Sequence, residues 1–227
     1  MNVVADCREA DKRLAGEAAA AEVRDGMLVG LGTGSTAAHA IRAIGAVGLS
    51  IDAVATSEAS AALARDVGIR VRDFADVTRV DLTIDGADEI DDRFLAIKGA
   101  GGAMLREKVV AAASDRMVVI ADGSKRVRSI GAAKLPVEVL PFAQAYVADA
   151  LGTMFGQVED RAAYRTDNGN LVLDCRAPRS DDWHKLAHWL ESIPGVAGHG
   201  LFLSEVDAVY VADAGTVTRL ERRLASG

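Results

Sequence analysis

Residues 27–36 read MLVGLGTGST, an apolar run that leads directly into a glycine-rich turn. Residues 27–31 are typical of a buried strand, and a helical pattern follows from Thr36 to Ile44. A strand joined to a helix by a short glycine turn is the repeating unit of parallel α/β sheets. This stretch therefore predicts an α/β fold.

The same alternation of apolar runs and helical patterns continues as far as residue 122. We expect strands at 51–56, 80–85, 94–99 and 117–122, and helices at 10–24, 60–68 and 103–114. Short β-rich runs that alternate with helices indicate a parallel sheet covered on both faces.

The chain changes character near Gly131. The patterns predict a strand at 134–142, a helix at 143–155, a hairpin of 162–165 with 170–176 around TDNG, a helix at 181–193 and a strand at 200–206. This order of elements is that of a small ferredoxin-like α+β unit. Residues 206–213 read as a further buried strand that returns to the first sheet. We therefore expect a larger α/β domain carrying the site, residues 1–130 plus 205–227, and a small α+β domain, residues 131–204.

Composition excludes several classes of protein. The chain has 33 acidic and 26 basic residues and a net charge of −7, which argues against nucleic acid or an anionic membrane as the main partner. No apolar run reaches the roughly 20 residues that a membrane span needs. The acidic N-terminal segment is unlike a signal or transit peptide. Cys7 and Cys175 show no paired spacing, so we expect a soluble cytoplasmic protein.

Four of the predicted strands end in polar or glycine-rich segments. These segments are GTGST (32–36), DGADEID (85–91), KGAGG (98–102) and ADGSK (121–125). In open parallel sheets, ligands bind at the carboxyl ends of the strands. The sequence therefore predicts one site at which these four segments meet.

The glycine loop GLGTGST lacks the lysine of a P-loop, and its third glycine comes one residue early for a dinucleotide fingerprint. Free N–H groups at the start of a helix favour an anion. The hydroxyl groups of Thr33, Ser35 and Thr36 add further donors. We predict a phosphate site here, with a strand–helix turn that binds no ligand as the alternative.

The acidic cluster at 84–91 contains Asp85, Asp88, Glu89 and Asp91. The spacing of an EF-hand calcium loop is absent. A solvated loop with a capping aspartate and a magnesium site on Asp85 and Asp88 both stay open as alternatives. Asp85 and Asp88 are the stronger candidates for function, because one ends the strand and the other lies one tight turn further on.

Two other patterns are weaker. His184 and His188 have the spacing of a zinc motif, but Lys185 replaces the glutamate of that motif and a third ligand is not evident. We predict that these histidines lie on one helix face beside the two tryptophans and bind no metal. Residue pattern alone distinguishes neither Lys98 nor Glu107 from ordinary surface residues.

Taken together, these motifs resemble the type A ribose-5-phosphate isomerases. The matching segments, in one order and spacing, are GLGTGSTAAHAI, TSEAS, DLTIDGADEID, IKGAGGAMLREKVVAAAS, ADGSK, LPVEVLPFA, TDNGNLVLD and IPGVAGHGLF. The resemblance implies a Rossmann-like α/β domain with a smaller α+β domain, which agrees with the order of elements above.

The resemblance also implies an activity: interconversion of ribose 5-phosphate and ribulose 5-phosphate through an enediolate, without metal or cofactor. By position, the proton-transferring glutamate corresponds to Glu107, the acidic pair to Asp85 and Asp88, and the active-site lysine to Lys98. The substrate contacts that the resemblance implies are Thr33, Gly34, Ser35, Thr36, Asp85, Gly86, Ala87, Asp88, Lys98, Gly99, Ala100, Gly101 and Lys125.

Two positions need separate mention. Lys12 also resembles a substrate-side lysine of the family. Ala100 replaces a glycine of the family pattern, and an alanine would be strained if this position required a positive φ.

We expect a sugar phosphate as the small-molecule partner and a homodimer or homotetramer as the assembly. Two other functions stay open. A sugar-phosphate-sensing domain of a transcription regulator should carry a basic DNA-binding module. A relative of the coenzyme A transferases would use a glutamate as a nucleophile and form a glutamyl thioester.

Overall fold

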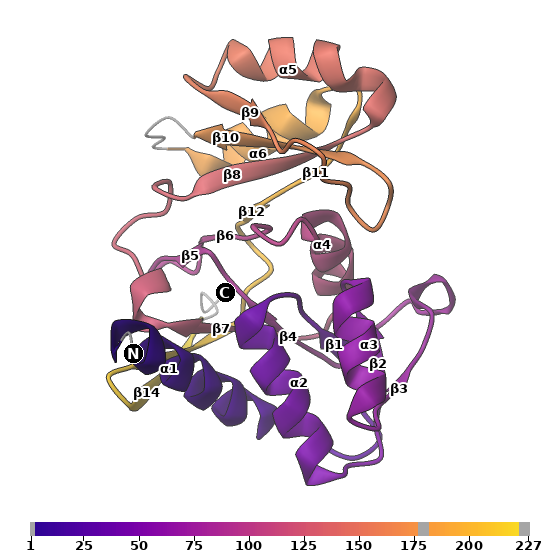
Figure 1. Cartoon of the computed structure of the whole chain (residues 1–227), viewed down its shortest axis with the longest axis vertical. Coiled ribbons are helices and arrows are strands. Elements are labelled where there is room, and N and C mark those ends of the chain that lie inside the picture. Colours follow the sequence, from indigo (N-terminus) through magenta and orange to yellow (C-terminus); the bar gives the residue numbers. More distant parts are fainter. Residues whose placement is uncertain (1–2, 177–181, 223–227) are drawn as a thin grey trace, which may run out of the picture.

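The computed structural model describes residues 3–176 and 182–222 (Figure 1). A seven-stranded sheet has the order β14-β13-β7-β4-β1-β2-β3. Its strands are β1 (Leu28–Leu31), β2 (Asp52–Ala55), β3 (Arg70–Val71), β4 (Leu82–Gly86), β7 (Met117–Asp122), β13 (Ala208–Asp213) and β14 (Thr216–Glu221). All neighbouring pairs are parallel except β13 with β14. The predicted parallel sheet is confirmed, and β14 adds an antiparallel edge that the sequence patterns did not predict.

Helices cover both faces of this sheet. They are α1 (Val3–Ala20), α2 (Ser35–Val47), α3 (Glu58–Asp66) and α4 (Met104–Ala112). In α2, Ile41 and Ile44 belong to a buried stripe at helical spacing, and they pack with Ile84 in one apolar cluster. On the opposite face, Val110 of α4 packs against Val54. The sheet is therefore buried on both sides, which explains its nearly continuous apolar strands.

Residues 94–99 depart from the prediction, because they contribute no strand to the large sheet. The short strands of this region are β5 (Glu89–Ile90), β6 (Ala96–Ile97) and β12 (Leu201–Phe202). They form a separate antiparallel sheet in the order β12-β6-β5. A parallel connection needs a crossover of about a dozen residues or more, and only residues 87–95 separate β4 from β6. The chain turns back instead, and the Asp91 carboxylate accepts a hydrogen bond from the N–H of Leu95.

A four-stranded sheet, at the top of Figure 1, has the order β11-β8-β10-β9 with all neighbours antiparallel. Its elements are β8 (Lys134–Val139), α5 (Gln144–Gly152), β9 (Val158–Asp160), β10 (Leu171–Arg176), α6 (Trp183–Ser192) and β11 (Val196–His199). This is the predicted ferredoxin-like order, which is confirmed. Both helices pack on one face, where Val147 and Leu190 are fully buried with Val137.

Two predicted strands of this sheet were misplaced. The strand predicted at residues 162–165 is not formed, because Ala163 has a φ of 58°, which a strand does not allow. These residues lie in the connection to β10, and the observed strand β9 comes before them. The strand predicted at residues 200–206 is not part of this sheet either. The observed strand β11 comes before it, and Leu201 pairs with Ile97 of β6 in the three-stranded sheet.

The remaining elements among the described residues are three short 3-10 helices, η1 (Phe74–Asp76), η2 (Gly123–Lys125) and η3 (Pro141–Ala143). The return of residues 206–213 to the large sheet is confirmed, since β13 pairs with β7. α1 ends earlier than the predicted helix, and Glu22, two residues beyond its end, forms an ion pair with Arg116. Residues 1–2, 177–181 and 223–227 lie outside the described residues, including residue 181 of one predicted helix. The division into two domains stays a prediction.

Candidate active site

A cavity of about 240 Å³ lies where β1, β4, β6 and β7 run into their loops. It is lined by Lys12, Thr33, Gly34, Ser35, Thr36, Gly86, Ala87, Asp88, Lys98, Gly99, Ala100, Gly101, Glu107 and Lys125. The four polar strand ends of the sequence therefore meet in one place. Asp85 lies behind this wall with a fully buried side chain.

Lys98 links the carboxylates of the site. Only 2% of its surface is exposed, and its Nζ lies 2.7 Å from Asp85 Oδ2 and 3.3 Å from Glu107 Oε2. Burial opposes the positive charge, but the carboxylates of Asp85 and Glu107 raise the pKa of Lys98 above its ordinary value. Lys98 is therefore a cation held at the wall of the cavity.

Asp85 joins the glycine loop to this lysine. Its Oδ1 accepts hydrogen bonds from the N–H groups of Thr33 at 3.0 Å and Gly86 at 2.7 Å. The close approach requires glycine at position 32, because a Cβ on Gly32 would lie 2.0 Å from Asp85 Oδ1. Each carboxylate oxygen of Asp85 thus has a fixed partner, and the side chain positions both Lys98 and the turn after β1.

Glu107 lies in the first turn of α4 and is 3% exposed. Its Oε2 has no hydrogen-bond partner among the described residues, although the ammonium of Lys98 is close by. Burial raises the pKa of Glu107 to about 8; the charge of Lys98 opposes this shift, and the nearby aspartates add to it. A carboxylate with a free oxygen and a pKa near neutrality has the properties of a general base.

The other acids of the cluster have separate tasks. Asp88 lines the cavity, and its Oδ2 accepts the N–H of Ala100 at 2.9 Å. Glu89 is buried and accepts three N–H groups of residues 131–133, which fixes the chain where it leaves for the four-stranded sheet. Asp91 closes the turn between β5 and β6. The cluster is therefore divided between the site and the structure around it.

The donor set does not favour the magnesium alternative. Asp85 Oδ2 faces the ammonium of Lys98, and Asp88 Oδ2 faces an N–H group. In the described part of the chain, no three histidine, cysteine, aspartate or glutamate side chains are grouped so that they could hold a metal ion. His184 and His188 of α6 line a separate cavity of about 160 Å³, whereas Trp183 is buried in the core beneath that helix.

The lining of the site cavity also includes groups that are suited to an anion. Helix α2 begins after Gly34, whose φ is 109°, and no side chain caps its first N–H groups. The hydroxyl-bearing residues Ser35 and Thr36 line the cavity there with Lys12 and Lys125. Lys12 Nζ lies 3.0 Å from Ser35 Oγ. Free N–H groups, a helix dipole and two ammonium groups are the features of a phosphate site.

Ala100 shows none of the strain that the sequence raised as a possibility. The positive φ angles of this loop belong to Gly99, at 95°, and Gly102, at 78°. Ala100 is absent from the positive-φ residues in the described chain. An alanine is therefore compatible with the backbone at this position.

The sequence patterns missed two side chains that hold the cavity wall. Arg161 donates a hydrogen bond to the carbonyl of Ala100 at 2.9 Å, and the hydroxyl of Tyr164 donates to the carbonyl of Gly101 at 2.8 Å. Both lie between β9 and β10, next to the TDNG turn. That turn had matched the family pattern without an assigned role, so it was the signal that could have led to them.

The fold and site define a class: Rossmann-like α/β proteins with a buried carboxylate base and lysine beside an anion site. A family model described as ribose 5-phosphate isomerase A (phosphoriboisomerase A) matches residues 52–216. The chain therefore belongs to the ribose 5-phosphate isomerase A family.

Individual relatives match nearly the full chain. Ribose-5-phosphate isomerase A of Sphingopyxis alaskensis is 49% identical over 210 residues, covering 89% of this chain and 92% of the relative. The crystal structure of ribose 5 phosphate isomerase A from Neisseria gonorrhoeae is 35% identical with a TM-score of 0.92, covering 96% of this chain and 98% of that one. A D-ribose-5-phosphate isomerase in complex with phospho-erythronic acid is 33% identical with a TM-score of 0.90, covering 95% and 99%.

Proposed function

We propose that the protein interconverts D-ribose 5-phosphate and D-ribulose 5-phosphate, the aldose–ketose isomerisation of the non-oxidative pentose phosphate pathway. The observation that carries this proposal is the free carboxylate oxygen of Glu107, beside the Lys98 ammonium in a cavity that also contains an anion site. Family membership supports the same reaction. It also favours the isomerase over the transcription regulator and the coenzyme A transferase considered from the sequence.

The reaction moves one proton between carbons. Glu107 removes the proton from C2 of the open-chain aldose, and the electron pair of the broken C–H bond forms the C1–C2 double bond of an enediolate. The oxygen that gains negative charge is balanced by the ammonium of Lys98. Glu107 then returns its proton to C1, the carbonyl forms at C2, and the carboxylate is regenerated.

A second proton has to move from the C2 hydroxyl to the oxygen on C1. Asp88 lines the cavity, so we assign this transfer and assistance in ring opening to Asp88. Asp85 is buried behind Lys98, and we assign to it the positioning of that cation and of the glycine loop. The two members of the acidic pair thus receive different roles, proton relay for Asp88 and positioning for Asp85.

We place the phosphate group of the substrate at the start of α2. One relative was solved with phospho-erythronic acid, which combines a phosphate and a carboxylic acid on one short chain. This pairing fits a cavity whose lining includes both an anion site and a buried lysine. A dianion held by α2 would align C2 of a flexible sugar with Glu107.

The direct test is a coupled assay of ribulose 5-phosphate formation from ribose 5-phosphate, with unphosphorylated ribose as the comparison substrate. We expect turnover of the phosphorylated sugar and very little of ribose. Absence of ribulose 5-phosphate in an assay that a known isomerase passes would contradict the proposed function.

Lys125→Ala should reduce kcat/KM for ribose 5-phosphate by roughly 10- to 100-fold, the cost of one hydrogen bond to a charged group. The loss should be much smaller for ribose, which has no phosphate to bind. Lys134→Ala is the matched control, because Lys134 pairs with Glu159 away from the cavity. Equal losses for both sugars would mean that Lys125 does not contact the phosphate.

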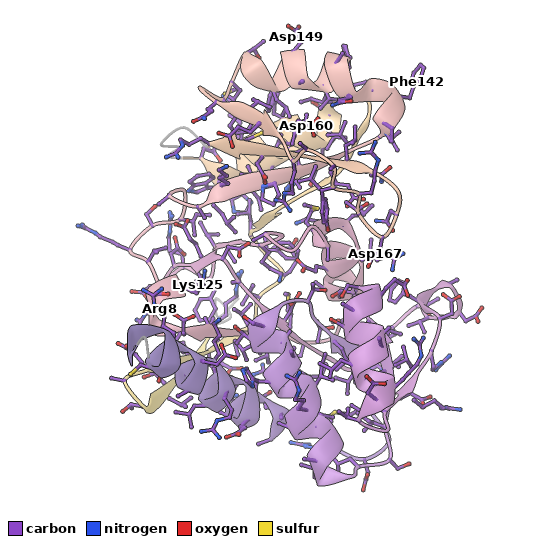
Figure 2. The ribbon with its side chains drawn as sticks, in the orientation of Figure 1. Arg8, Lys125, Phe142, Asp149, Asp160 and Asp167 are labelled. Atoms are coloured by element: carbon purple, nitrogen blue, oxygen red, sulfur yellow. The ribbon has the colours of Figure 1, made fainter. Side chains whose placement is uncertain are left out.

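We propose a homodimer or homotetramer as the assembly. Support comes from apolar side chains exposed around η3 and α5, namely Leu140, Phe142 and Tyr146. Phe142 points away from the body of the molecule in Figure 2. Sedimentation equilibrium should give a multiple of 23.7 kDa, which Phe142→Glu lowers if this surface is the contact. A monomer at micromolar concentration would contradict the proposal.

We place the reaction in the cytoplasm. Among the described residues, no helix has the length and apolar character needed to cross a membrane. Cys7 and Cys175 are both free thiols, which suits a reducing compartment. Fractionation of cells would contradict this location if the activity appeared outside the cytoplasmic fraction.

The net charge of −7 supports the absence of nucleic acid and membrane partners.

A further inference from the structure

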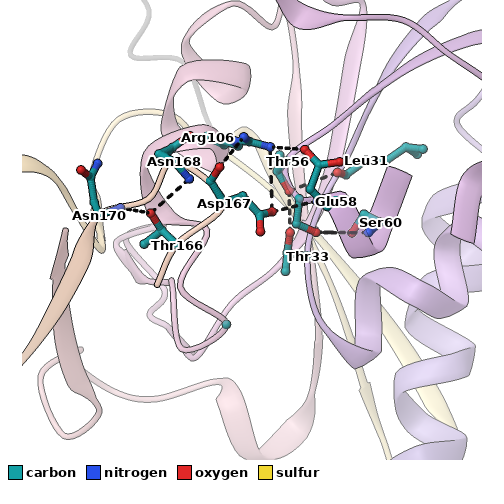
Figure 3. Close-up of polar contacts among 12 residues, drawn as sticks. Leu31, Thr33, Thr56, Glu58, Ser60, Arg106, Thr166, Asp167, Asn168 and Asn170 are labelled. Carbon is teal, nitrogen blue, oxygen red and sulfur yellow. Dashed lines mark hydrogen bonds and ion pairs between the residues drawn. The ribbon is translucent and has the colours of Figure 1, made fainter. Parts of the chain in front are cut away.

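Residues 161–170, which join β9 to β10 and which we call the bridging loop, reach from the four-stranded sheet to the walls of the active site. They contain the segment TDNGN (166–170), to which the proposed reaction gives no role. Figure 3 shows part of this loop beside α4 and the start of α3. Asp167, at the tip of the loop, also lies near these helices in Figure 2.

The first set of contacts holds α4. Arg106 immediately precedes Glu107, and its guanidinium donates hydrogen bonds to Asn168 Oδ1 at 2.9 Å and to the carbonyl of Asp167 at 3.0 Å. A third hydrogen bond, at 3.0 Å, goes to Glu58 Oε1 of α3 (Figure 3). The planar fork of arginine suits several acceptors in fixed directions. Arg106 therefore ties the first turn of α4 to the bridging loop and to α3.

The same contacts continue toward the glycine loop. The Asp167 carboxylate accepts the N–H of Glu58 at 2.8 Å, at the start of α3. Two residues further on, Ser60 Oγ donates to the carbonyl of Gly32 at 2.6 Å. The segments TSEAS (56–60) and TDNGN, both without an assigned role, thus meet each other next to the active site.

The second set of contacts holds the loop that follows Lys98. Arg161 donates to the carbonyl of Ala100 at 2.9 Å and is itself fixed by Asp174, whose Oδ2 lies 2.9 Å from its Nε. The hydroxyl of Tyr164 donates to the carbonyl of Gly101 at 2.8 Å.

The bridging loop is anchored by a buried glutamate. Glu138 of β8 is 0% exposed, and its Oε1 accepts hydrogen bonds from Thr166 Oγ1 at 2.8 Å, Asn168 Nδ2 at 3.0 Å and Asn170 Nδ2 at 2.9 Å. Three donors on one buried carboxylate oxygen fix the shape of the loop more firmly than solvent-exposed hydrogen bonds could.

We propose that the bridging loop positions the active site: through Arg106 it fixes Glu107, and through Arg161 and Tyr164 it fixes the loop that carries Lys98. Arg106 is then a positioning residue for proton transfer, although it does not line the site cavity. The reason is geometric, because a displacement of about 1 Å at a reacting group can cost as much as 10²-fold in rate. This inference rests on the proposed isomerase function.

The first experiment compares Arg106→Met with Arg116→Met. Both arginines are partly exposed, at 32% and 27%, and both pair with acidic side chains. Arg116 joins Glu22 to Glu221, away from the cavity. We expect Arg106→Met to lower kcat roughly tenfold with little change in KM. We expect Arg116→Met to lower the melting temperature and leave kcat unchanged.

The second experiment repeats Arg106→Met in a Glu107→Gln background. A residue that acts through Glu107 has nothing left to position there, so the further loss in kcat should be less than about twofold. An equal loss in both backgrounds would overturn the role of Arg106. So would an unchanged kcat after Arg106→Met in the otherwise wild-type protein.

The third experiment removes single hydroxyl groups. It also tests whether the bridging loop positions the active site in case the Arg106→Met variant does not fold. Tyr164→Phe should lower kcat about two- to tenfold, the effect of one hydrogen bond, without a matching loss in melting temperature. Tyr210→Phe is the control, because the hydroxyl of Tyr210 donates to Glu22 at 2.8 Å, away from the cavity. Equal kcat values for the two variants would overturn the proposal. Inactivity of the wild type would instead contradict the proposed function itself.

Discussion

Glu107→Gln is expected to lower kcat by about 10²-fold or more, the low end of the contribution of a general base. The amide has nearly the same shape, but it cannot accept the proton that the carboxylate removes from C2. Lys98 keeps its shorter contact to Asp85, so the fold should survive. Steady-state kinetics measure the loss, with circular dichroism and a thermal melt as controls. Near-normal turnover in a folded variant would place the base elsewhere, most simply on Asp88.

The same residue should govern the acid side of the pH profile. Glu107 acts as a base only when deprotonated, and burial raises its pKa to about 8. As the pH falls below that value, the active fraction declines, so kcat/KM should fall about tenfold per pH unit. The substrate phosphate also titrates near pH 6, so its ionisation adds a second pH-dependent change in kcat/KM. The Glu107→Gln variant separates the two effects, because it should remove the pH dependence that is due to Glu107 and keep the one that is due to the phosphate. A flat wild-type profile between pH 5 and 9 would contradict the assignment.

Lys98→Met should lower kcat by roughly 10²- to 10³-fold, comparable to the loss of one oxyanion-stabilising donor. The ammonium matters most when charge develops on the enediolate, so the loss should appear in kcat and not only in KM. The substitution also leaves Asp85 buried without its cation, which should lower the melting temperature.

A double variant separates these two effects. Adding Asp85→Asn to Lys98→Met removes the unpaired buried charge, so stability should recover while kcat stays low. If Lys98→Met raises KM alone, Lys98 is a binding residue and the enediolate assignment is wrong.

Wild-type activity should survive exhaustive chelation, because the Lys98 ammonium already occupies the position next to Asp85 that a metal ion would need. The check is the coupled assay after dialysis against EDTA. Loss of activity that magnesium or manganese restores would revive the metal alternative for Asp85 and Asp88.

Local patterns predicted most of the fold, because five strands of the large sheet, β1, β2, β4, β7 and β13, lie in apolar runs followed by glycine or polar residues. MLVGL and MVVIAD became β1 and β7 within a residue or two of the expected bounds. Residues 94–99 were misassigned because strand-like composition does not reveal the partner strand. Only the short connection from β4, which rules out a parallel crossover, carries that information.

The sequence predicted the location of the candidate site more fully than the role of each residue in it. Glycine loops and strand ends indicated where the cavity lies, and the family resemblance supplied Glu107 and Lys98. The burial of Asp85 behind Lys98 could not be predicted, because it depends on how tightly Gly32 packs against its carboxylate. Arg161 and Tyr164 were missed for a similar reason, since their contacts join parts of the chain about 60 residues apart.

The central claim is that Glu107 carries the proton between C2 and C1. Its most direct test is NMR detection of solvent deuterium entering C1 of ribulose 5-phosphate and C2 of ribose 5-phosphate when the reaction is run in D₂O. The proton held on the Glu107 carboxyl exchanges with solvent in a fraction of turnovers before it is returned to carbon. The wild type should therefore introduce deuterium at these carbons during turnover, and a folded Glu107→Gln variant should do so at least about 10²-fold more slowly. Deuterium entering at the wild-type rate in the folded Glu107→Gln variant would contradict the account.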